Sequence, residues 1–131
     1  MKHDPHYHLE WRLNLVDVIK LLLPSLSPRI QSDGPPIRCP LPSHPSWLSK
    51  ASFRVSTDLQ NERKTWCCSA DGCWPGSTNR TLDFLRAYLG LSLDQALLLW
   101  RKLAGTKPDH RLQLLSAELG PIWSPTKEVL R

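Results

Sequence analysis

Long apolar runs are missing from this chain of 131 residues. No stretch approaches the roughly 20 consecutive apolar residues that a membrane-spanning helix needs, and the polar start, residues 1–8, has no hydrophobic signal core. We therefore expect a cytoplasmic protein with no membrane partner. In a reducing cytosol, clustered cysteines and histidines are metal ligands more often than disulfides.

Sequence signatures of catalysis are missing as well. The chain has no glycine-rich phosphate loop, no nucleophile elbow and no Asp-x-Asp pair. Its acidic residues are scattered and offer no obvious cluster that would hold Mg²⁺ for nucleotidyl transfer. We expect that the chain is not an enzyme by itself.

Cysteine is scarce, but its distribution is the most informative feature of the sequence. All four cysteines fall in two groups, Cys39 with the nearby His44, and the pair Cys67 and Cys68 followed by Cys73. Thiolates and an imidazole from two loops supply the tetrahedral ligand set that Zn²⁺ prefers. The pattern therefore predicts a zinc site.

The third ligand is either Cys67 or Cys68. In an extended strand Trp66 and Cys68 share one face and Cys67 points to the other, although either could bind if the strand runs up to the site. We prefer Cys68. The predicted ligands are Cys39, His44, Cys68 and Cys73. Four protein ligands leave no coordination position for an activated water, so this metal would be structural rather than catalytic.

One helix is expected before the ligands. Apolar residues recur at helical spacing from Leu9 to Leu23, and Pro24 ends the pattern. The expected stripe contains Trp11, Leu15, Val18, Ile19 and Leu22. Prolines then crowd the next twenty residues, which predicts an irregular connection up to the first ligands.

A β-hairpin is predicted between the two ligand groups. Residues 51–56 alternate apolar and polar side chains, with Phe53 and Val55 on one face. Residues 58–61 supply the turn, and residues 63–67 return as the second strand.

Three helices are predicted after the last ligand. The expected spans are 79–89, 93–104 and 110–119. Thr78 or Asn79 can cap the first, a capping box from Ser92 opens the second, and Asp109 caps the third. The last ten residues are expected to form a tail or a docked extension. The fold class is α+β, a zinc ribbon with a small antiparallel sheet flanked by helices.

Short motifs occur in a specific order along the chain. They are Val16–Ile19, Cys39-Pro-Leu41 with His44, Ala51–Val55, an aromatic before Cys68 and Cys73, Leu82–Leu85, and Gly90–Ala96. This order resembles the N-terminal zinc-binding domain of DnaG-type bacterial primases, over roughly residues 14–104. The Cys-x2-His and Cys-x2-Cys spacings of that family are each two residues wider here. Aligning the family's aromatic with Trp66 places the third ligand at Cys68.

The resemblance implies a zinc ribbon whose sheet binds single-stranded template DNA and helps to choose the priming site. We expect residues 14–107 to form this domain, after a polar tail and helix start (1–13) and before a C-terminal helix and tail (108–131). The family's polymerase core would need several hundred more residues. We therefore expect a stand-alone module that presents template to a separate primase catalytic subunit or replicative helicase, or regulates priming.

Basic and aromatic residues interleave on or beside the hairpin in a way that suits this role. Ten of the 17 basic residues but only five of the 12 acidic ones lie between Arg38 and Lys107, and the net charge is +5. Cations follow the backbone of a single strand while bases stack on rings. The candidate residues are Lys50, Arg54, Arg63, Lys64, Trp66 and Trp74. Phe53 also suits a core position, Trp74 could pack against the following helix, and the cations could form a solvated face.

A different class of function also fits. The leucine-rich segments 93–104 and 110–119 could dock a helicase, a polymerase or another copy of the chain. The alternative is therefore a zinc-stabilised protein–protein interaction module.

Overall fold

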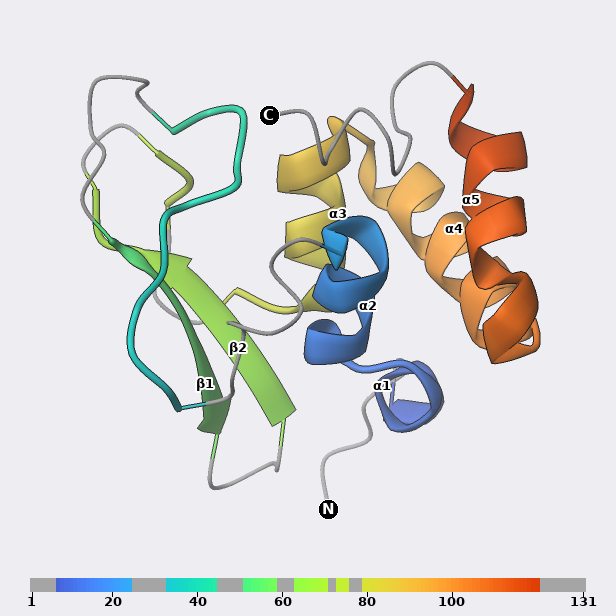
Figure 1. Cartoon of the computed structure of the whole chain (residues 1–131), viewed down its shortest axis with the longest axis horizontal. Coiled ribbons are helices and arrows are strands. Elements are labelled where there is room, and N and C mark those ends of the chain that lie inside the picture. Colours follow the sequence, from blue (N-terminus) through green and yellow to red (C-terminus); the bar gives the residue numbers. More distant parts are fainter. Residues whose placement is uncertain are drawn as a thin grey trace.

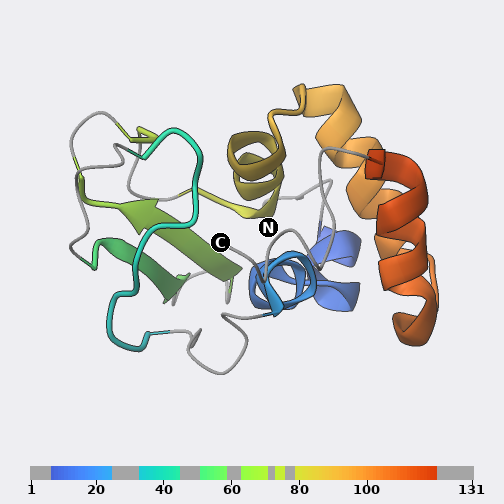
Figure 2. The ribbon, with the colours of Figure 1, turned by 45° about the horizontal axis from the view of Figure 1, so that its top comes forward.

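The computed structural model describes residues 7–24, 33–44, 51–58, 63–70, 73–75 and 79–120. The elements are α1 (Tyr7–Arg12), α2 (Leu15–Leu22), β1 (Phe53–Asp58), β2 (Arg63–Cys68), α3 (Thr81–Leu89), α4 (Leu93–Ala104), a 3₁₀ helix (Pro108–His110) and α5 (Arg111–Leu119). The hairpin lies at one end, α4 and α5 lie at the other, and α2 and α3 lie between them (Figures 1 and 2). The predicted mixture of helices and a small antiparallel sheet is confirmed.

The N-terminal segment forms two helices, so the prediction of one helix is wrong. α1 ends at Arg12 and α2 begins at Leu15. Between them, the Asn14 side chain accepts a hydrogen bond from the Asp17 N–H (3.0 Å), and the Asp17 carboxylate accepts one from the Asn14 N–H (3.1 Å). This capping box starts a new helix in a new direction. Trp11 is consequently 80% exposed, whereas the rest of the predicted stripe is buried.

The hairpin forms where it was predicted, with strand ends shifted by up to two residues. The register sets Phe53 opposite Cys68 and Val55 opposite Trp66. These four side chains share one face of the sheet, and all are buried. The predicted turn between the strands lies mostly outside the described residues.

Helix α3 begins later than predicted. Asn79 forms an isolated β-bridge with Trp66, which keeps its backbone extended. The helix therefore starts at Thr81, and Asp83 accepts a hydrogen bond from the backbone N–H just before it (2.9 Å). Asn79 is thus an edge of the sheet and not a helix cap, while Thr78 lies outside the described residues.

Helix α4 matches its predicted span, but α5 does not start as expected. The capping box between Ser92 and Gln95 is present. Leu93 lies in the first turn, outside the packed stripe, and is exposed. A 3₁₀ turn precedes α5, which begins at Arg111, so Asp109 does not cap it.

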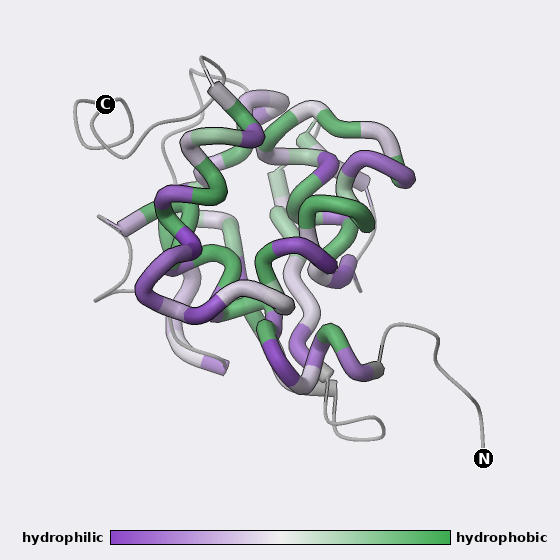
Figure 3. Tube along the Cα trace, turned by 90° about the vertical axis from the view of Figure 1, so that its right-hand side faces the viewer, coloured by the Kyte–Doolittle hydropathy of each residue, from purple (hydrophilic) through white to green (hydrophobic). Residues whose placement is uncertain are grey.

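One apolar core joins the hairpin to the helices. Phe53 stacks on Trp66 with 5.5 Å between ring centroids, and Phe84 of α3 meets both rings edge-on at 6.1 and 5.9 Å. Farther along, the buried Trp100 of α4 donates its indole N–H to the Leu13 carbonyl (2.9 Å). Hydrophobic and hydrophilic residues alternate along the helices (Figure 3), as amphipathic elements around a shared core require.

Candidate metal centre

The four predicted ligands meet where β2 ends. Cys39, His44, Cys68 and Cys73 each offer one ligand atom, and these atoms lie within 4.8 Å of one another. The Cys39 and Cys73 sulfurs are 3.7 Å apart, and the Cys68 sulfur is 3.4 Å from Nδ1 of His44. Zn–S bonds of about 2.3 Å and Zn–N bonds of about 2.0 Å give tetrahedral edges of about 3.5 to 3.8 Å. The two measured contacts are therefore close to the edges of a tetrahedron around one ion.

Cys67 lies outside this cluster. In the β register it pairs with Arg54, on the face opposite to that of Cys68. The alternation of side chains along β2 therefore separates the two adjacent cysteines. Cys68 is buried beside the other three ligands, and Cys67 is a half-buried free thiol.

A backbone turn presents the second ligand of each loop. In the first loop the His44 N–H donates to the carbonyl of the buried Leu41 (3.1 Å). In the second loop the Cys73 N–H donates to the Ala70 carbonyl (3.4 Å). Each turn returns the chain to the ligand that precedes it, which explains how these wide spacings still form one compact site.

Backbone amides also stabilise the first sulfur of each loop. The Leu41 amide is hydrogen-bonded to the Cys39 sulfur, and the Ala70 amide is hydrogen-bonded to the Cys68 sulfur. Hydrogen bonds of this kind favour the thiolate over the thiol. The thiolate is the form that binds a metal ion.

The sulfurs also affect one another. Burial raises the pKa of the Cys39 thiol well above its usual range, and the Cys73 and Cys68 sulfurs raise it further. Burial acts to raise the pKa of Cys68 too, but hydrogen bonds with Ser52, Ala70 and the other two cysteines lower it to about 7. Thiolates this close repel each other, and a divalent cation would offset that repulsion.

Two hydroxyl groups beside the ligands were missed by the sequence analysis. Oγ of the buried Ser52 lies 3.2 Å from the Cys68 sulfur, and Oγ of Ser43 lies 3.8 Å from the Cys73 sulfur. Ser52 is held in place because its N–H donates to the Ile37 carbonyl at the edge of the sheet (3.0 Å). No spacing pattern links a hydroxyl to a sulfur on another segment, so no sequence signal marks these residues.

One aromatic residue predicted to bind nucleic acid, Trp66, requires a correction. Trp66 is only 1% exposed and donates its indole N–H to the Arg80 carbonyl (2.9 Å). A ring buried in this way has no face for a base, because it already packs on Phe53. Lys64 is half-buried and donates to the Thr57 hydroxyl (3.1 Å).

Two other predicted residues remain accessible. Arg54 is exposed on β1. Trp74 is half-buried, with the Arg86 guanidinium 6.0 Å from its ring centroid, a cation–π arrangement. Lys50 and the side chain of Arg63 lie outside the described part of the chain.

Comparisons with protein-family models, with curated proteins and with solved structures found no match for this chain. The site is therefore interpreted from its own geometry. Among the described residues, no helix is both long enough and apolar enough to cross a lipid bilayer.

Proposed function

We propose that Cys39, His44, Cys68 and Cys73 hold one Zn²⁺ in a closed structural site of the zinc-ribbon type. The observation that carries this proposal is the pair of tetrahedral edges, 3.7 Å between two sulfurs and 3.4 Å between sulfur and imidazole nitrogen. Three sulfurs and one nitrogen suit Zn²⁺ and not Mg²⁺ or Ca²⁺, which prefer oxygen. The ion would tie residues 39–44 to residues 68–73.

Metal content tests this site. We expect about one zinc per wild-type chain and per Cys67→Ser chain, and a large loss of zinc in Cys68→Ser. Cys67→Ser is the matched control because it removes an adjacent thiol outside the cluster. A folded wild-type chain that purifies without zinc would contradict the proposal.

We infer that the zinc-bound module binds single-stranded DNA within a primase-like replication system, where it presents template or regulates priming. The order of sequence motifs supports this, as does the net charge of +5. Arg38 and Arg54, both exposed, flank the bridge between Ile37 and Phe53 beside the ligand loops. Such cations attract phosphates, and the ring of Trp74 could stack on a base.

Oligonucleotide binding at about 50 and 200 mM salt tests the inference, with tryptophan quenching as the readout. We expect saturable binding that weakens as salt rises. Arg38→Glu with Arg54→Glu should weaken binding about tenfold or more, whereas Lys107→Glu, at the far end of the molecule, should have little effect. Binding that is absent at low salt, or independent of salt, would contradict the inference.

A second candidate is an interaction module that docks a helicase or polymerase. Trp11 on α1 and Leu93 on α4 favour it, because both are large apolar side chains at the surface. The two candidates can be separated. Arg38→Glu with Arg54→Glu should leave protein binding intact while DNA binding is lost, and Leu93→Asp should have the opposite effect.

A further inference from the structure

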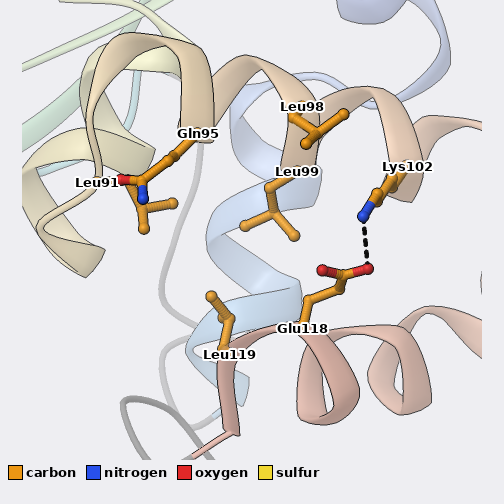
Figure 4. A pocket seen from close by; sticks show the side chains of 7 residues that line it. All are labelled: Leu91, Gln95, Leu98, Leu99, Lys102, Glu118 and Leu119. Carbon is orange, nitrogen blue, oxygen red and sulfur yellow. Dashed lines mark hydrogen bonds and ion pairs between the residues drawn. The ribbon is translucent and has the colours of Figure 1, made fainter.

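A groove of about 200 Å³ lies between α4 and α5, at the end of the molecule away from the metal centre. Its apolar walls are formed by Leu91, Leu98, Leu99 and Leu119. An ion pair between Lys102 and Glu118, 2.7 Å long, borders it on one side (Figure 4).

The chemistry of this groove suits apolar side chains better than an ionic or drug-sized ligand. Its volume is below the roughly 300–1,000 Å³ of small-molecule pockets. Lys102 and Glu118 neutralise each other, so no unpaired charge among the lining residues attracts an ion. Leu98 stands at the rim and is 53% exposed, while Leu99 and Leu119 are buried. One or two apolar side chains would fill the groove and cover Leu98.

The chain carries suitable side chains next to the groove. Leu119 lines the groove and ends α5, and Ile122 and Trp123 follow three and four positions later. An extended chain covers about 3.5 Å per residue, so both side chains can reach the groove. Gly120, with φ of 53° and ψ of −123°, turns the chain off the α5 axis, a conformation that glycine adopts far more readily than other residues.

We propose that Ile122 and Trp123 dock in this groove and hold α5 against α4. Docking would bury a large aromatic surface and cover the exposed Leu98. A tethered segment needs little intrinsic affinity, because its effective concentration at the groove is high. The occupant is thus a segment of the same chain.

Nuclear magnetic resonance of the zinc-loaded 131-residue chain observes this contact directly. With leucine methyl groups labelled, we expect cross-relaxation peaks between the Trp123 indole and the methyls of Leu98 and Leu99. Trp123→Phe assigns the indole signal. Absence of these peaks, with the indole at its unfolded-peptide shift, overturns the proposal. Peaks that arise only between differently labelled molecules assign the groove to a second copy and overturn it as well.

Thermodynamic coupling gives a second readout. Leu98→Ala and Trp123→Ala should change the unfolding equilibrium constant non-additively, by about threefold or more, because contacting residues couple. Leu112→Ala is the matched control, since Leu112 on α5 is 44% exposed and does not line the groove. It should be additive with Trp123→Ala. Additivity between Leu98→Ala and Trp123→Ala overturns the proposal.

Discussion

Cys67 and Cys68 are adjacent and chemically identical, yet only Cys68 joins the cluster of possible metal ligands. Trp66 and Trp74 differ in a similar way, because the first is buried in the core and the second is half-buried beside Arg86. At the scale of the residue, the face on which a side chain emerges decides what chemistry it can take part in.

The hydroxyl of Ser52 provides a prediction at this scale. Its hydrogen bond to the Cys68 sulfur favours the thiolate and orients it, so Ser52→Ala should lower zinc affinity about 10- to 100-fold. Competition with a chromophoric chelator measures this. Ser56→Ala, on β1 and away from the ligands, is the control. Equal affinities in wild type and Ser52→Ala would show that the hydroxyl does not act on the metal.

Glu10 gives a second prediction, concerning charge. The carboxylate accepts a hydrogen bond from the Thr81 hydroxyl, and burial raises its pKa although Thr81 and Arg80 act to lower it. The Glu10 carboxyl therefore binds its proton more tightly in the folded state than in the unfolded state. Stability from Glu10 is greatest below its ordinary pKa and falls as pH rises towards the raised value.

Glu10→Gln keeps the acceptor oxygen and removes the charge. The variant should be more stable than wild type at about pH 7, and its advantage should shrink as the pH falls to about 4. Urea unfolding across this range measures the difference. A wild type that is more stable throughout would mean that the attraction of Arg80 outweighs the cost of burial.

At the scale of the element, helix starts depend on short-range hydrogen bonds. Asn14 and Asp17 form the box that begins α2, and Ser92 and Gln95 form the box that begins α4. The second box is evident from sequence, whereas the first interrupts a continuous apolar pattern. The capping bonds of Asn14 therefore set where α2 begins.

Replacing Asn14 tests this assignment. Asn14→Ala should lower the free energy of unfolding by about 1 kcal/mol, because the side chain no longer accepts from the Asp17 N–H. Asn14→Asp keeps an acceptor at this position and should stay within a few tenths of a kcal/mol of wild type. Urea unfolding distinguishes them. Equal stability of all three proteins would show that the cap contributes nothing.

At the scale of the molecule, two separate sets of contacts hold the hairpin in place. One set lies in the ligand loops and the other in the aromatic core. The Phe53 and Trp66 rings fix the hairpin to Phe84 of α3. The four candidate ligands bring the two loops together at the end of β2. Because both sets of contacts act on the same hairpin, loosening the loops should weaken the packing of the whole domain.

Metal removal tests that coupling. Chelation should lower the midpoint of thermal unfolding by more than about 10 °C, given the size of zinc binding free energies. It should also weaken the near-ultraviolet circular dichroism of the aromatic core. Added Zn²⁺ should restore both signals and added Mg²⁺ should not. A midpoint that does not change on chelation would mean that the loops are held without an ion.

Local patterns in the sequence were enough to predict several features. The two ligand groups, the hairpin between them and the α4 cap at Ser92 all depend on residues close together in the chain. The pleat of a single strand separated Cys68 from Cys67, and the preference for Cys68 came in part from the resemblance to the primase zinc domain. Periodicity and ligand spacing report such short-range relations directly.

Contacts between distant segments were decided by the tertiary structure alone. Trp66 could have been a stacking platform until packing on Phe53 placed it inside, and Ser52 meets Cys68 only because the strands pair in one register. Glu10 and Thr81 are likewise far apart in the chain. Burial depends on everything that packs around a residue, and the sequence around a single position does not contain that information.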